Sequence, residues 1–84
     1  MSGRDDEAAL RRAVHLLALP ENWDSYGAPK ITSSAVDAAL RLRAALATEP
    51  AMVPTSKGGV QLEWHDRGFD VELELLPDGQ LASE

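Results

Sequence analysis

The sequence predicts an α+β fold in which two N-terminal helices pack on one face of a three- to four-stranded antiparallel sheet. Two observations support this prediction. Apolar residues recur at helical spacing in the first half, and apolar and polar residues alternate strictly in two later segments. A chain of 84 residues has room for one domain, so residues 1–84 are expected to form a single unit. Its helical half covers residues 5–48 and its sheet half residues 51–82.

The first expected helix runs from Asp5 to Leu19. Its acidic first turn suits the positive end of the helix dipole, and Pro20 ends it because the residue before a proline avoids helical geometry. The opposite, solvent-facing side should carry Arg11, Arg12 and His15. At about 100° per residue, six apolar residues fall on one broad stripe that we expect to be buried: Ala9, Leu10, Ala13, Val14, Leu16 and Leu17.

The second expected helix runs from Thr32, a favourable N-cap, to about Thr48. Arg43 falls inside its apolar arc. It is either a long side chain that keeps its charge in water at the edge of the stripe or a cation directed at an acidic neighbour. The expected buried stripe, with Leu40 at its edge, consists of Ala35, Val36, Ala39, Leu42 and Leu46.

A turn-rich loop between Leu19 and Ile31 connects the two helices and holds half of the four aromatic residues, Trp23 and Tyr26. An aromatic side chain in such a loop either closes the end of the core or forms a contact site. We expect Trp23 to close the core, whereas both roles stay open for Tyr26. Asp24 and Ser25 are expected to make local hydrogen bonds to the backbone.

Two alternating segments, residues 59–65 and 69–75, predict a hairpin with Asp66-Arg67-Gly68 as its turn. A short strand over residues 80–82 follows the turn signal Pro77-Asp78-Gly79, and residues 51–53 supply a further strand. We expect the helices to cover one face of this sheet. That face carries Val60, Leu62, Trp64, Phe69, Val71, Leu73 and Leu75.

The opposite face of the predicted hairpin is a band of carboxylates. Residues 1–50 carry six basic and seven acidic groups, whereas residues 51–84 carry two basic and seven acidic groups, so the net charge of −6 lies mainly in the last third. Like charges on neighbouring strands are destabilising. The band is therefore either a solubilising surface or a docking surface for a basic partner. Its members are Gln61, Glu63, His65, Asp70, Glu72 and Glu74.

Composition argues against several classes of function. The absence of cysteine excludes disulfides and thiolate metal sites, and the acidic balance argues against direct binding to nucleic acid or to an anionic membrane. No apolar run approaches the roughly 20 residues of a membrane span. Residues 1–7 have no apolar signal core, so we expect a cytoplasmic location.

Catalytic chemistry has few candidates in this sequence. His65 lies near Asp66 and, across the hairpin, Asp70, and such a pair could form half of a general-base system. No nucleophile with a matching context accompanies it. The carboxylates beside His65 do not have the spacing of a known metal-binding loop. We therefore expect no enzyme, no metal and no cofactor.

Two motifs resemble those of a family of small bacterial single-domain proteins. The first is the loop Asn22-Trp23-Asp24-Ser25-Tyr26-Gly27-Ala28, in the pattern N-W-D-x-x-G-A. The second is Gly58-Gly59-Val60-Gln61-Leu62-Glu63-Trp64, in the pattern G-G-x-Q-[LF]-E-W. The resemblance spans roughly residues 20–76 and implies a bacterial origin. It implies no activity, catalytic residue or cofactor.

These observations predict a small, acidic, non-catalytic interaction module, such as an antitoxin, an immunity or inhibitor protein, or an accessory subunit of a larger and basic bacterial protein. A nucleic-acid mimic acting on a basic DNA-binding protein is the alternative, followed by a small enzyme using His65 with Asp66 or Asp70. A homodimer that buries Leu19, Leu40 or a sheet edge also stays open. The expected partner-binding residues are Trp23, Tyr26, Glu63, Asp70, Glu72 and Glu74.

Overall fold

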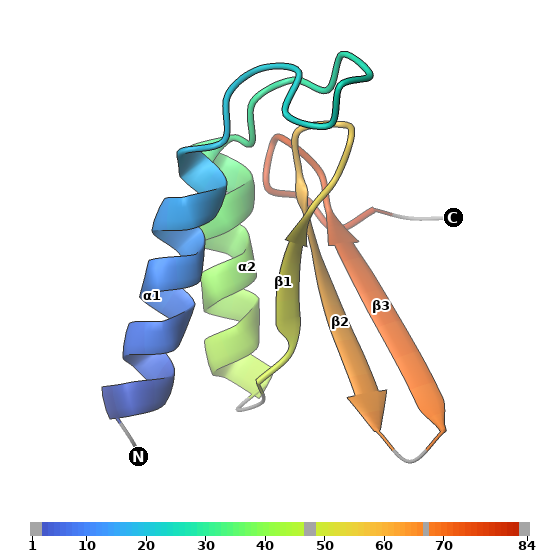
Figure 1. The fold of residues 1–84 in the computed structure, drawn as a ribbon. Coiled ribbons are helices and arrows are strands. Elements are labelled where there is room, and N and C mark those ends of the chain that lie inside the picture. Colours follow the sequence, from blue (N-terminus) through green and yellow to red (C-terminus); the bar gives the residue numbers. More distant parts are fainter. Residues whose placement is uncertain (1–2, 47–48, 67, 83–84) are drawn as a thin grey trace.

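The computed structural model describes residues 3–46, 49–66 and 68–82. Helices α1 (Gly3–Leu17) and α2 (Ser33–Leu46) precede strands β1 (Ala51–Pro54), β2 (Val60–Asp66) and β3 (Phe69–Leu75). The strands form one antiparallel sheet in the order β1-β2-β3, and both helices lie on one side of it (Figure 1). The predicted α+β class with an antiparallel sheet is therefore confirmed.

Helix α1 begins and ends two residues earlier than predicted and is more exposed than the pattern predicts. It ends at Leu17 in a tightened turn, in which the Ala18 N–H bonds the His15 oxygen (3.2 Å) as well as the Val14 oxygen (3.0 Å) and the Leu19 N–H bonds the Leu16 oxygen (3.2 Å). Ala9, Ala13 and Leu16 are buried as expected. The prediction for Leu10, Val14 and Leu17 is wrong, since all three are exposed. The main contacts of helix α1 are with α2 and β1, and they cover a narrower arc than the six apolar residues occupy.

The solvent-facing position expected for Arg12 is also wrong. Arg12 is half-buried, and its Nε donates a hydrogen bond to the main-chain oxygen of Met52 at 2.8 Å. This contact arises because β1 runs beside α1 and comes within reach of a long side chain. The Arg12 guanidinium therefore connects α1 to β1, an edge strand of the sheet.

Helix α2 begins as predicted. Thr32 Oγ1 accepts a hydrogen bond from the Ala35 N–H at 3.1 Å, which is the expected N-cap contact. The same hydroxyl donates to the Pro77 oxygen at 2.6 Å and so ties the helix start to the turn after β3. Ala35, Val36 and Ala39 are buried. The rest of the predicted stripe is less covered: Leu42 is half-buried, Leu46 is exposed, and the expected end at residues 47–48 lies outside the described residues.

The strand register confirms the predicted division of the hairpin into two faces. Val60 pairs with Leu75, and Trp64 pairs with Val71, so the apolar side chains of β2 and β3 share one face. Asp66 pairs with Phe69 and therefore belongs to β2 instead of the predicted turn. The strand expected over residues 80–82 is reduced to a single bridge, Leu75 to Leu81, so the described sheet has three strands.

The core lies between the helices and one end of the apolar face of the sheet. Leu16, Val60 and Leu62 are its largest fully buried side chains, and Leu19 and Leu40 pack against it instead of standing unused on the surface. The other end of this face is open: Phe69 is 74% exposed and Val71 is 50% exposed. Their predicted burial is wrong because the hairpin tip extends past the C-terminal end of α2 (Figure 1).

Candidate functional site

The sheet face opposite the helices carries the acidic band, which we define as Gln61, Glu63, His65, Asp70, Glu72 and Glu74. Its members form three directly opposed pairs across β2 and β3: Gln61 with Glu74, Glu63 with Glu72, and His65 with Asp70. The four carboxylates that were predicted as contact residues therefore lie on one surface. They are Glu63, Asp70, Glu72 and Glu74. Residues this close across strands interact directly.

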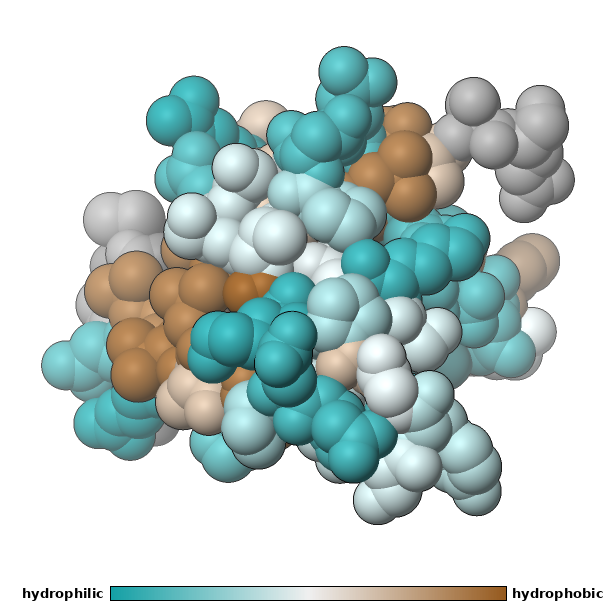
Figure 2. Space-filling model, turned by 90° about the horizontal axis from the view of Figure 1, so that it is seen from above, coloured by the Kyte–Doolittle hydropathy of each residue, from teal (hydrophilic) through white to brown (hydrophobic). Residues whose placement is uncertain are grey.

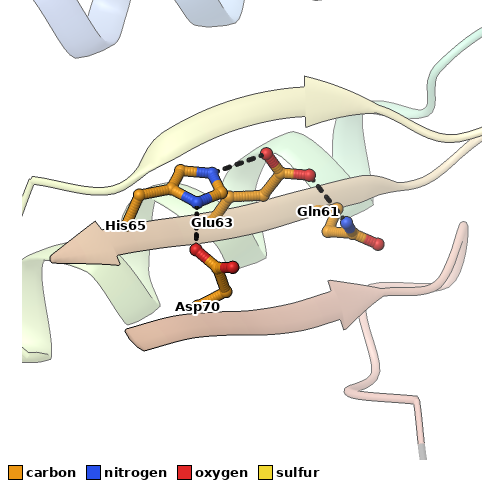
Figure 3. Close-up of polar contacts among 4 residues, drawn as sticks. All are labelled: Gln61, Glu63, His65 and Asp70. Carbon is orange, nitrogen blue, oxygen red and sulfur yellow. Dashed lines mark hydrogen bonds and ion pairs between the residues drawn. The ribbon is translucent and has the colours of Figure 1, made fainter. Parts of the chain in front are cut away.

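Four of the six members of the acidic band are linked by hydrogen bonds (Figure 3). His65 Nδ1 lies 2.7 Å from Asp70 Oδ1, and its Nε2 lies 3.4 Å from Glu63 Oε1. Gln61 Nε2 donates to the other Glu63 oxygen at 2.8 Å. The hydrogen bonds to Asp70 and then to Glu63 raise the pKa of His65 above its ordinary value, because the protonated ring can donate to both carboxylates at once.

The charge of the band is compensated at one end by a lysine. Lys57 Nζ, from the turn between β1 and β2, lies 3.7 Å from Glu74 Oε2. Within residues 3–46, 49–66 and 68–82, Glu63, Asp70 and Glu72 form no ion pair with a lysine or arginine. Among the described side chains, the cationic contact of Lys57 is therefore at the Glu74 end of the band, and His65 contacts Glu63 and Asp70 at the hairpin end.

His65 stands on open surface. Its side chain is 58% exposed, and neither of the two hollows described below includes it. Asp66 is the other acid considered as its partner, and its side chain lies outside the described part of the structure. Among the described residues, no three His, Asp or Glu side chains are grouped so that they could hold a metal ion.

The loop between the helices is ordered by its own hydrogen bonds. Asp24 Oδ1 accepts the N–H groups of Tyr26 (2.9 Å) and Ala28 (3.1 Å), and Asn22 Oδ1 accepts that of Gly27 (2.6 Å). Asn22 and Ser25 take left-handed conformations, with φ of 64° and 67°. Non-glycine residues in this region cost energy and persist only where the surroundings fix them. The polar residues of the N-W-D-x-x-G-A motif therefore fold the loop through local hydrogen bonds, and the predicted local hydrogen bonds of Asp24 are confirmed.

The two aromatic side chains of this loop differ in exposure. Tyr26 is 91% exposed, whereas Trp23 is half-buried and its Nε1 is shielded from solvent without a hydrogen-bond partner among the described residues. A fixed loop presents Tyr26 without a further ordering cost on binding. The exposure of Tyr26 leaves it accessible, and its role in partner binding stays a prediction.

The predicted contact residues form two separate areas. The loop adjoins the turn between β1 and β2, where the Thr32 N–H donates to the Gly58 oxygen at 3.0 Å. Asp70 lies near the tip of the β2–β3 hairpin, at the opposite end of the sheet (Figure 1). Trp23 and Tyr26 therefore do not join Asp70 in one compact site.

Apolar residues at the hairpin tip are contact candidates that the sequence reasoning missed. Phe69 and Val71 are exposed, and a shallow hollow of about 390 Å³ is lined by Leu46, Trp64, Val71 and Leu73. Alternation assigned these strand residues to the covered face. Periodicity carries no signal for this exposure, because it does not show how far the covering helix extends along the strands (Figure 1).

Two further surface features lie near α1. Figure 2 shows a hydrophobic area on the side of the molecule where α1 lies, and the exposed large apolar residues of that helix are Leu10, Val14 and Leu17. A hollow of about 430 Å³ lies between α1 and β1, lined by Ala8, Ala9, Arg12, Arg43 and residues 49–53. Arg43 is half-buried there. The sequence predicted that Leu10, Val14 and Leu17 would be buried and that Arg12 would face solvent, and the structure shows the reverse.

Comparisons with known proteins give no further assignment. No protein-family model matches this chain, and no curated protein sequence or solved structure matches it. Within the described residues, neither helix has the length and apolar character that crossing a membrane requires. The family resemblance of the two motifs stays a prediction.

Proposed function

We propose that this protein is a small non-catalytic module that binds a larger, basic protein through the acidic band. The observation that carries the proposal is the direct opposition of Glu63 and Glu72 on the sheet face opposite the helices. Among the described residues neither forms an ion pair with a lysine or arginine, and the cationic contact of Glu63 is with His65. Such an arrangement lowers the stability of the free protein. A cationic partner surface would relieve the repulsion, so the arrangement favours the bound state and speeds encounter.

The loop between the helices supplies a second contact in this proposal. Tyr26 would act as an aromatic anchor, since exposed tyrosines on preorganised loops are common sources of binding energy. A module of this kind acts by occupying a surface of its partner. An antitoxin, an immunity or inhibitor protein, or an accessory subunit in the bacterial cytoplasm would work in this way.

Neutralisation of the acidic band tests the proposal. The variant Glu63→Gln/Glu72→Gln/Glu74→Gln removes three charges from the band, and the control Glu7→Gln/Glu21→Gln/Asp37→Asn removes three exposed charges elsewhere. The tagged full chain is used to isolate partners from bacterial lysate at low and high salt. We expect the wild type and the control to retain a stoichiometric basic protein that the band variant loses, with weaker retention at high salt. Equal retention by all three chains would contradict the proposal.

Two alternatives predict different results in two further assays. A nucleic-acid mimic would be displaced from its partner by duplex DNA, whereas a module that recognises another surface would not. Self-association through Leu10, Val14 and Leu17 of α1 would appear as a dimer in sedimentation of the purified chain, without any partner. The acidic band and the α1 stripe lie on different elements, so the two kinds of contact can be separated by mutation.

A further inference from the structure

The outer edge of β3 has main-chain groups available for pairing. The Glu74 oxygen accepts the Ala82 N–H at 2.8 Å, so the main chain of Glu74 faces away from β2. Along an antiparallel strand, the N–H and C=O groups of successive residues point alternately toward one neighbouring strand and toward the other side. The N–H and C=O groups of Asp70 and Glu72 therefore also point outward. Among the described residues, the chain beyond this edge returns only at the Leu75–Leu81 bridge and leaves the hairpin half of β3 uncovered.

The other edge of the sheet is protected. Met52 offers its oxygen outward from β1, but Arg12 Nε already donates to it at 2.8 Å. Pro54 has no N–H to offer. Natural sheets protect their edges with such devices to prevent pairing with other chains. The contrast between β1 and β3 marks the latter as the edge that is suited to strand addition.

The side chains along this edge define which strand would fit. Asp70 and Glu72 point to the polar face, and Phe69, Val71 and Leu73 point to the face that the helices leave partly open. An added strand would place alternate residues against the carboxylates and the others against the apolar side chains and the 390 Å³ hollow beside Val71. A strand of alternating cationic and apolar residues is complementary to both faces.

A second copy of this chain fits the edge poorly. Every residue of β3 whose main chain faces outward is acidic: Asp70, Glu72 and Glu74. Antiparallel pairing of two β3 edges would therefore set carboxylate against carboxylate in any register. Like charges directly opposite each other destabilise a sheet. The same charges that repel a second copy attract a basic strand.

We propose that the basic partner binds by adding an antiparallel β-strand of alternating lysine or arginine and apolar residues to the free edge of β3 at residues 69–73. This inference rests on the proposed function and specifies its geometry. Main-chain hydrogen bonds to Asp70 and Glu72 would supply affinity, and the two alternating sets of side chains would supply specificity.

The probe is an end-capped octapeptide of alternating lysine and valine, titrated into the full chain and followed by amide NMR. We expect the Asp70 and Glu72 amides to shift and to exchange more slowly with solvent, since both would become hydrogen-bonded. In antiparallel pairing, the peptide residues that bond these amides have side chains on the acidic face. N-methylation of the lysines should therefore weaken binding by about tenfold or more, whereas N-methylation of the valines should leave it nearly unchanged.

The outcomes separate this inference from the proposed function. Equal binding of the two methylated peptides, without protection of the Asp70 and Glu72 amides, overturns strand addition. If the retained partner still requires Glu63, Glu72 and Glu74 in that case, the proposed function stands and only its geometry is wrong. A glutamine–valine octapeptide that binds as tightly as the lysine–valine peptide would overturn the requirement for a basic strand.

Discussion

Glu63 of β2 and Glu72 of β3 lie directly opposite each other on the face of the sheet that the helices leave open. Each could have been a lysine without any effect on the core, because neither belongs to it. The core therefore does not require two carboxylates at these positions, and Glu63 is held by Gln61 and His65 on its own strand.

Replacement of Glu72 by lysine should stabilise the fold. Glu72→Lys converts a repulsive cross-strand pair into an attractive one, and we expect unfolding to require about 0.2–1 kcal/mol more free energy. Urea denaturation measures this change, with Glu72→Gln as the control that removes charge without reversing it. The same variant should bind the basic partner more weakly than wild type. A less stable Glu72→Lys protein would contradict the claim that this pair is repulsive.

The titration of His65 should depend on Asp70. Hydrogen bonds to Asp70 and, to a smaller extent, Glu63 raise the pKa of His65 above 6.5. We expect Asp70→Asn to lower this pKa more than Glu63→Gln does, as measured by NMR of the ring protons. Asp78→Asn lies in the turn after β3 and serves as the control.

The raised pKa also sets the sign of a pH effect on stability. Protonated His65 is favoured in the folded state, so its contribution is fully present below the unfolded pKa and is lost as pH rises through the folded pKa. Comparison of wild type with Asp70→Asn across this pH range should show the difference narrowing as pH rises. The His65 side chain is largely exposed, so the effect should be small. A difference that widens with pH would contradict this assignment.

Tyr26 and Trp23 should respond differently to truncation. Tyr26 is 91% exposed, so Tyr26→Ala should change the free energy of unfolding by no more than about 0.5 kcal/mol. Trp23 is half-buried, and Trp23→Ala should cost about 1–3 kcal/mol. Thermal or urea unfolding separates the two, and partner binding by Tyr26→Ala then tests its role as an anchor. Equal destabilisation by both variants would show that Tyr26 has a structural role.

Gly59 should tolerate no side chain. A Cβ at this position would lie 2.0 Å from the main-chain oxygen of Leu75, on the neighbouring strand. We expect Gly59→Ala to destabilise the protein by about 3 kcal/mol, the upper end of the range for overpacking. Gly27→Ala is the matched control, because a Cβ there meets no atom within 4 Å and only the strain of its φ of 87° remains, about 1 kcal/mol. Equal losses would show that β2 and β3 can separate to admit a methyl group.

The sequence determined the local elements and the division of the hairpin into faces. Period-two alternation assigned Glu63 and Glu72 to one surface, and the side-chain chemistry of Thr32 predicted the start of α2. The turn residues around Tyr26 likewise predicted an ordered loop. These features depend on residues that are close in sequence or that face each other across a short turn. The pattern of residue types along the sequence is therefore enough to predict them.

Only the tertiary structure decided how far each face is covered. Periodicity shows which residues share a face, but the length and position of the packing partner decide which of them are buried. Leu16 and Val14 lie on the same predicted stripe, yet α2 and β1 cover Leu16 and leave Val14 in solvent. In the same way, α2 covers the Leu62 end of the sheet and leaves Phe69 exposed beside the free edge of β3. The free edge of β3 follows from the short return of the described chain after Leu75, and the apolar face beside it stays open because α2 ends before the hairpin tip (Figure 1).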